Sequence, residues 1–168
     1  MASRIPALID SLVFARNYTV ELLDTIPQSD WFTMPPGCPS HIAWQVGHLT
    51  IAEARLVLDR VCGQNITDGN YVPANYVTIF GRLSAAETNP SQYPTASHIR
   101  EVFDRVHAAS FELAAHVPEA DLDSVSPGVP HRFCKTKAEF LRWASHHEFL
   151  HTGHIGLIRR MLGHAPVW

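Results

Sequence analysis

The last quarter of the chain carries the feature that most restricts the fold, a helical pattern that runs from Thr136 to Gly163 without a break. Thr136 and Glu139 have the T-x-x-E spacing of a capping box, which satisfies free N–H groups at a helix start. Arg159 and Arg160 suit the negative end of a helix, and Gly163 suits its termination. A helix this long needs partner helices to cover its apolar side.

Three earlier segments have the same apolar period, at residues 5–26, 41–62 and 95–117, and proline-rich connectors separate them. Ser40 and Thr95 are the expected N-caps of the second and third helices. Residues 64–94 have no strong period and are expected to form a long loop that covers the functional site. The sequence therefore predicts an all-α fold, a four-helix bundle with a long loop between helices 2 and 3, as a single domain over residues 1–168.

Composition narrows the classes of partner. The formal charge of −3 comes with no basic stripe, which argues against nucleic acid. The sequence lacks a run of about 18 apolar residues and an apolar signal-peptide block at its start, so no membrane association is expected. Cys38, Cys62 and Cys134 are odd in number and show no C-x-x-C spacing, so we expect reduced packing thiols in a cytoplasmic protein.

Histidines are concentrated in the final helix. His147 and His151 are four residues apart and stack on one face, as two imidazoles must to bind one metal ion, whereas His146 and His154 join this pair less naturally. His48 lies on the buried stripe of the second helix, where an imidazole needs a partner. That partner is either a core hydrogen bond or a metal shared with the pair. A set of core histidines without metal is the third possibility.

The sequence His147-Glu148-Phe149-Leu150-His151 also matches H-E-x-x-H, in which Glu148 would be the general base of a zinc protease. No acidic residue follows Glu148 to provide the third ligand, and His154 stands where the longer form of the motif has glycine. A protease is therefore disfavoured. Glu148 stays a weak catalytic candidate that could orient a ligand or accept a proton, with a surface or capping carboxylate as the alternative.

Several motifs together resemble the DinB-like superfamily over nearly the whole length. They are Trp44-x-x-Gly47-His48-Leu49, Phe80-Gly81, His147-Glu148-x-x-His151-x-Gly153-His154-Ile155 and Arg159-Arg160-Met161-Leu162-Gly163. The resemblance implies a four-helix bundle that holds a divalent metal through His48, His147 and His151. Many relatives have glutamine where this chain has His154. His154 is therefore expected either to support the ligands from beside them or to serve as an extra ligand. His146 and His41 are lesser alternatives.

Three neutral imidazoles leave a coordination position open for water or substrate, as in catalytic metal sites. Imidazole ligands suit Zn or Ni best here, with Fe and Co as alternatives, and such an ion activates a bound water or thiol. Relatives of this family include S-transferases and an isomerase that use low-molecular-weight thiols. The expected function is a metal-dependent enzyme on a small molecule, thiol-dependent S-transferase-like or hydrolase-like. The alternative is a non-catalytic, metal-stabilised binding or stress-response domain. A homodimer through helix 1 or helix 3 is also expected from the resemblance.

Overall fold

The computed structural model describes residues 3–167, and this part of the chain is all-helical, with five α-helices and no strand. The helices are α1 (Ile5–Asp24), α2 (Ile42–Glu53), α3 (Tyr76–Phe80), α4 (Ala96–Ala114) and α5 (Lys137–Met161). The all-α class is confirmed. The count differs from the expected four because α3 forms inside the segment predicted as loop. Tyr76 and Phe80, four residues apart, are both completely buried, and this packing explains a helical turn in a segment with no long apolar period.

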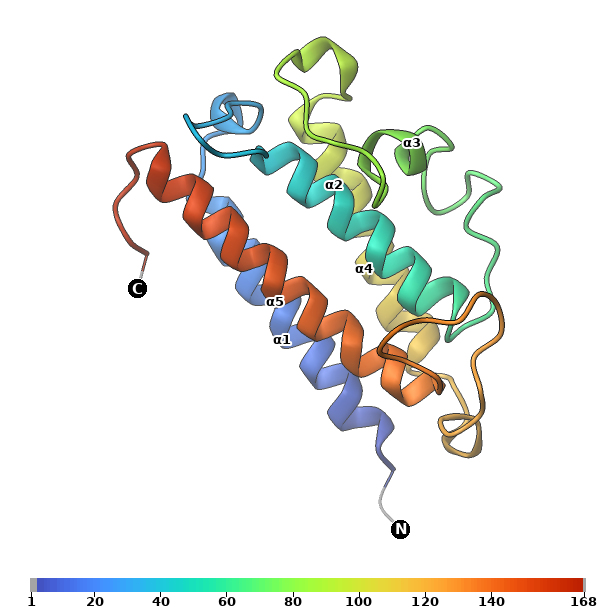
Figure 1. Ribbon diagram of the computed structural model, residues 1–168. Helices are drawn as coiled ribbons and strands as arrows, with labels where there is room; N and C mark the ends of the chain where they lie inside the picture. Colours follow the sequence, from blue (N-terminus) through green and yellow to red (C-terminus); the bar gives the residue numbers. More distant parts are fainter. Residues whose placement is uncertain (1–2, 168) are drawn as a thin grey trace.

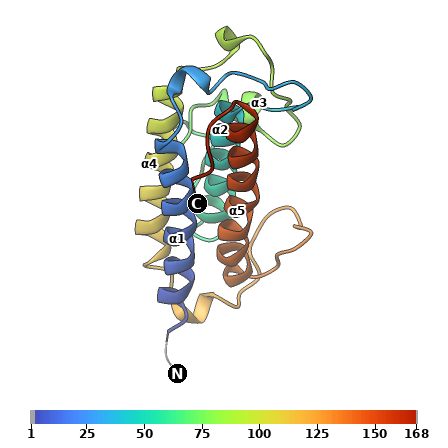
Figure 2. The same ribbon diagram turned by 90° about the vertical axis from the view of Figure 1, so that its left-hand side faces the viewer.

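The four long helices lie side by side (Figure 1). Helix α5 packs against α1 and α2, and α4 packs against the same two helices. The connector between α4 and α5 lies at one end, whereas the connector that contains α3 runs along the helices from the end of α2 to the start of α4 (Figure 1). The view turned by 90° shows α1 and α4 on one side and α2 and α5 on the other (Figure 2). The seam between α2 and α5 therefore forms one face of the molecule.

Helix α2 begins one residue later than expected. His41, not Ser40, is its N-cap, since the His41 Nδ1 accepts a hydrogen bond from the Trp44 N–H at 3.0 Å. The helix then continues as a π-helical segment over Ala54–Asp59, where Arg60 N–H donates to the Arg55 carbonyl five residues back. The predicted caps of the other two helices are confirmed, with Thr95 before α4 and the complete Thr136 capping box before α5.

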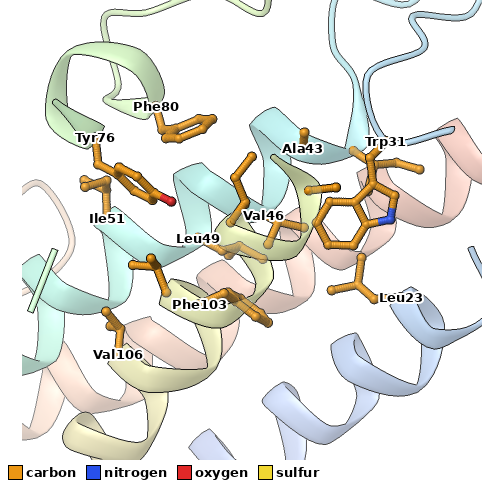
Figure 3. Packing of buried hydrophobic residues seen from close by; sticks show 14 of the residues in the cluster. Leu23, Trp31, Ala43, Val46, Leu49, Ile51, Tyr76, Phe80, Phe103 and Val106 are labelled. Carbon is orange, nitrogen blue, oxygen red and sulfur yellow. The ribbon is translucent and has the colours of Figure 1, made fainter. Parts of the chain in front are cut away.

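The buried apolar residues form two clusters, a larger one that includes Trp31, Phe80 and Phe103 and a smaller one that includes Leu12, Val57 and Phe140. Figure 3 shows Trp31 and Leu23 near one end of α2 and Tyr76, Phe80 and Ile51 farther along it. Phe80 lies so close to α2 that a Cβ atom at Gly47 would collide with its ring. Only glycine at position 47 permits this contact, which fixes α3 against α2.

Among the described residues, no helix is both long enough and apolar enough for a membrane span.

Candidate metal centre

Three histidines from two helices lie together at the seam between α2 and α5. They are His48 of α2 and His147 and His151 of α5, hereafter the histidine cluster. Each can offer one ring nitrogen so that the three nitrogens lie within 4.8 Å of one another. The ring centroids of His48 and His151 are 4.7 Å apart, and those of His147 and His151 are 4.6 Å apart. All three side chains are half-buried, so the cluster reaches the surface rather than lying sealed in the core.

Helix α3 fixes the orientation of His48. The His48 Nδ1 is 2.8 Å from the Phe80 carbonyl oxygen, which can only accept, so Nδ1 carries the proton and Nε2 is left as a lone-pair donor. Gly81 permits this turn, since a Cβ there would collide with the Val77 backbone oxygen. The indole ring of Trp44 stacks on the face of the His48 ring, with centroids 4.9 Å apart and planes 8° apart. Backbone and side-chain packing therefore aim one nitrogen of His48 into the cluster.

Gln45 fixes the orientation of His151 in the same way. The Gln45 Oε1 lies 2.6 Å from the His151 Nδ1, and the Gln45 Nε2 donates to the Ser40 Oγ at 2.8 Å. Because the amide nitrogen is already a donor to Ser40, the amide oxygen faces the imidazole, and the His151 Nδ1 donates to it. The Nε2 of His151 is thus the free nitrogen, as in His48. Hydrogen bonds of this kind set the tautomer of metal-binding histidines.

Burial keeps these imidazoles neutral at pH 7. It lowers the pKa of His147 to about 4 and that of His151 to about 2, with neighbouring histidines adding to both effects. Burial also lowers the pKa of His48, against the opposing effect of the Phe80 carbonyl. A neutral imidazole has the lone pair that a metal ligand needs.

The chemistry of the donor set fits a divalent transition metal. Imidazole nitrogens about 2.0–2.1 Å from a tetrahedral ion lie about 3.3 Å from one another, so shifts of about 1 Å or less at each nitrogen would close the cluster on an ion. Within the part of the chain that the structure describes, the group that could hold an ion comprises these three histidines. Three nitrogen ligands leave a position for another molecule.

The remaining candidate histidines lie outside this group. His154 is exposed and meets the edge of the His151 ring, with centroids 5.5 Å apart and planes at 90°. His146 is exposed on another face of α5, and His41 caps α2. Of these, His154 alone contacts the cluster, as a ring beside a possible ligand.

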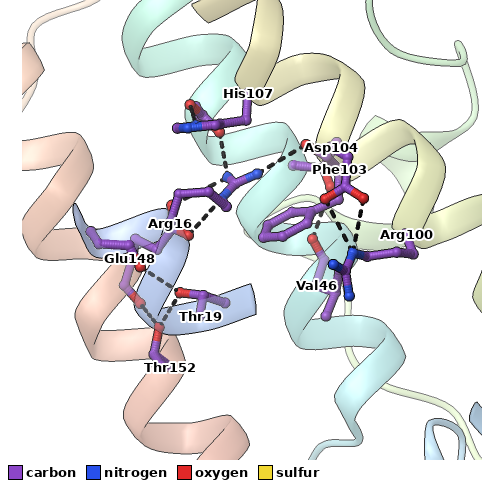
Figure 4. A network of polar contacts seen from close by, with 12 residues as sticks. Arg16, Thr19, Val46, Arg100, Phe103, Asp104, His107, Glu148 and Thr152 are labelled. Carbon is purple, nitrogen blue, oxygen red and sulfur yellow. Dashed lines mark hydrogen bonds and ion pairs between the residues drawn. The ribbon is translucent and has the colours of Figure 1, made fainter. Parts of the chain in front are cut away.

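Glu148 does not face the histidine cluster. Its carboxylate is buried on the side of α5 that faces α1, where Arg16 donates from Nε to Oε1 at 2.7 Å and from Nη2 to Oε2 at 3.2 Å (Figure 4). With both oxygens bound by Arg16, this carboxylate is not available as a proton acceptor at the cluster. The weak catalytic assignment of Glu148 is therefore not retained.

Arg16 is the centre of a buried ion-pair group that the sequence reading missed. Its guanidinium also pairs with Glu53 and donates to the Phe103 carbonyl at 3.0 Å, and Glu53 Oε1 lies 2.9 Å from His107 Nδ1. Burial opposes the charge on Arg16, but Glu53 and Glu148 outweigh it and raise the pKa of the guanidinium. A signal existed: Arg16 occupies the apolar stripe of the first helix, between Leu12 and Thr19, where an isolated charge requires a partner.

The three cysteines are free thiols, half-buried at Cys38 and Cys62 and buried at Cys134. Burial raises the pKa of Cys62 and of Cys134 to about 11, which keeps both thiols protonated at pH 7. A protonated thiol is a poor nucleophile, in accord with a packing role.

Fold and site together define an all-helical protein with three histidines gathered between two antiparallel helices. The chain belongs to the DinB superfamily, since the sequence model of that family matches residues 11–155, a span that includes all three histidines. The family resemblance inferred from the motifs is thereby confirmed. No curated protein matches the chain.

Proposed function

We propose that the protein is a metal-dependent enzyme that binds Zn or Ni at His48, His147 and His151 and acts on a small molecule. The observation that carries the proposal is the arrangement of the cluster: two of the three imidazoles are oriented through Nδ1, so that Nε2 of each is free. A closed structural site would use a fourth protein ligand. Three ligands leave room for a reactant.

A divalent ion held there would act as a Lewis acid that lowers the pKa of a water or a substrate thiol. The chain's own part is to hold the ligands: the Phe80 carbonyl and Gln45 set the tautomers, and Trp44 packs over His48. Transfer of a low-molecular-weight thiol to an electrophile is the proposed reaction, with hydrolysis as the nearest variant. The partners in this proposal are small molecules rather than nucleic acid or membrane, and the location is the cytoplasm, where thiols stay reduced.

Metal content tests the proposal on protein that carries no His-tag. We expect about one equivalent of metal in the wild type, and loss of most of it in His147→Ala. His146→Ala is the matched control, because it removes the adjacent imidazole, which is exposed and outside the cluster. Equal metal content in the two variants would contradict the site. A screen of thiols with electrophiles, run with and without added metal, then tests turnover.

The alternative is a metal-stabilised domain without turnover. It is favoured by the position of the cluster, which joins α2 to α5, so that a bound ion would clamp the two helices. In that case metal raises the melting temperature strongly while no thiol and electrophile pair reacts. Pairing of two copies through α1 or α4, which carry the exposed side chains Phe14 and Phe111, also stays a prediction.

A further inference from the structure

Two connectors approach the histidine cluster, the segment that follows α3 and the connector between α4 and α5. From the first, Phe80 bonds to His48, and the Ser84 Oγ accepts a hydrogen bond from the Trp44 indole at 3.0 Å. Arg82 lies between these two anchors in the sequence. The backbone of residues 80–84 is therefore tied to α2 at the level of His48.

The second connector brings His131 toward the same place. The His131 ring lies 6.1 Å from the Trp143 ring, which in turn lies 6.3 Å from His147. Arg60 holds this connector in position, since it donates to the Ser126 Oγ at 3.0 Å and to the Val129 carbonyl at 2.8 Å. The first connector therefore contacts the cluster at His48, and the second approaches His147 through Trp143.

Two arginines are placed near the cluster by the backbone. Arg55 stands seven residues after His48, about two helical turns along the same face of α2 and its π-helical continuation. Arg82 belongs to the segment that Phe80 and Ser84 tie to His48 and Trp44. In accord with these positions, Arg55 lowers the pKa of His48 and Arg82 lowers that of His131, in both cases as a smaller effect than burial.

The side chains of Arg55 and Arg82 also form none of the polar contacts that hold the described residues together. Both are exposed, and neither guanidinium has a hydrogen bond or ion pair with any described residue, even though Asp59 stands four residues after Arg55. The other arginines of this region make contacts within the protein. Arg60 donates hydrogen bonds to the second connector, and the Arg132 guanidinium lies 5.2 Å from the centroid of the Phe133 ring. Unpaired guanidinium groups beside a possible reaction centre are suited to bind oxyanions, which they grip with two parallel N–H donors.

We propose that the substrate is a small oxyanion, whose carboxylate, phosphate or sulfonate group binds to Arg55 and Arg82 while its reacting group lies at the histidine cluster. The inference rests on the proposed function and specifies its substrate class. A thiol co-substrate would on this view carry an anionic group of its own. The two arginines are binding residues that select the substrate by charge.

The test measures binding of succinate, and of its neutral analogue succinamide, by calorimetry at low salt. Wild type, Arg55→Gln, Arg82→Gln and the double variant are compared, both as purified and after removal of metal with EDTA. We expect each single variant to weaken succinate binding about three- to tenfold and the double variant more than about tenfold. Added 0.5 M salt should weaken wild-type binding by a similar factor, because these guanidinium groups are exposed.

Arg142→Gln is the matched control, because Arg142 is an exposed arginine of α5 outside this group and its loss changes the net charge equally. The inference is overturned if the double variant binds succinate as the wild type does, if Arg142→Gln weakens binding equally, if succinamide binds as tightly, or if no succinate binds. Metal content separates the two proposals. If the arginine variants keep their metal but lose succinate binding, the arginine site is supported. If succinate binding depends on the arginines in a protein that never binds metal, the anion site is supported and the metal centre is contradicted.

Discussion

Helices α2 and α5 each contribute to two polar groups on different faces, and the two groups differ in how completely the protein satisfies them. On α5, His147 and His151 face the histidine cluster, while their immediate neighbours Glu148 and Thr152 face the buried side. Successive residues of a helix project about 100° apart, so adjacent positions can serve opposite faces. The same stretch of helix therefore contributes to two groups. The histidine cluster reaches the surface and is called the open group, whereas the buried ion-pair group of Arg16, Glu53 and Glu148 is called the sealed group.

The sealed group leaves the Arg16 guanidinium fully engaged. It bonds to Glu148, Glu53 and the Phe103 carbonyl, and it lies 3.5 Å from the centroid of the Phe103 ring. The open group keeps imidazole nitrogens with no partner among the described residues. Polar groups satisfied within the protein hold the fold together, whereas spare donors on oriented side chains are what a ligand can use. The contrast favours a structural role for the sealed group and supports the proposal that the open group binds a ligand.

Replacing the central cation of the sealed group should have the largest effect. Arg16→Met leaves Glu53 and Glu148 buried without their partner, and we expect a loss of about 3–5 kcal/mol in the free energy of unfolding, measured by urea denaturation. Arg100→Met is the control, since its ion pairs with Asp24 and Asp104 are partly exposed and contribute less than about 1 kcal/mol. If Arg16→Met does not fold, Glu148→Gln, which keeps the shape and removes one charge, gives a milder measurement. Equal losses in the arginine variants would remove the distinction between the sealed group and the surface.

Acid should affect the two groups in separate pH ranges. The folded-state pKa values of His147 and His151 lie below the ordinary value of 6.5, so the unfolded chain takes up protons first as the pH falls. The stability of the metal-free protein is therefore complete above pH 6.5 and decreases below it, by roughly 2–3 kcal/mol from His147 alone by pH 4.5. Burial raises the pKa of Glu53, but Arg16 and His107 together outweigh burial and lower it, so the contribution of Glu53 is present above pH 4.5 and is lost only as the pH falls through its folded value.

Urea denaturation of EDTA-treated protein between pH 7 and pH 4.5 measures this dependence. His147→Ala should reduce the slope in that range and leave the part that comes from His151 and His48, whereas His146→Ala, which removes an exposed imidazole, should leave the curve unchanged. A wild-type curve with no slope above pH 4.5 would contradict the neutral, desolvated state of the histidine cluster.

The sequence predicted the parts of the fold and site that depend on local spacing. The Thr136 capping box, the Thr95 cap and the pairing of His147 with His151 follow from distances of three or four residues along a helix. The approach of His48 to that pair spans about a hundred residues, and the motif resemblance supplied it where periodicity could not. Helix α3 escaped prediction because five residues carry too short a period to recognise.

The partners of the two polar groups could not be read from the sequence for a related reason. Glu148 lies beside His147, and sequence proximity suggested a shared role, but a rotation of about 100° places its carboxylate against Arg16. Gln45 and the Phe80 carbonyl orient the histidines from positions with no distinctive chemistry. Such contacts depend on how helices turn relative to one another, and that is decided by the packing of the whole core.

The smallest expected effect concerns Gln45, which belongs to the open group without contacting the metal position. Gln45→Leu removes the acceptor that holds the His151 Nδ1 proton, so the ring can rotate or change tautomer, and metal affinity should fall about ten- to hundredfold. Gln45→Glu keeps an oxygen at the same place and should retain most of the affinity. Ser40→Ala removes only the other hydrogen bond of the Gln45 amide and should change affinity little. Competition with a chromophoric chelator measures all three, and circular dichroism confirms that each variant is folded. If Gln45→Leu binds metal as tightly as the wild type does, hydrogen bonds to the histidines are not what makes the open group able to bind metal. The open and sealed groups would then differ only in how deeply they are buried.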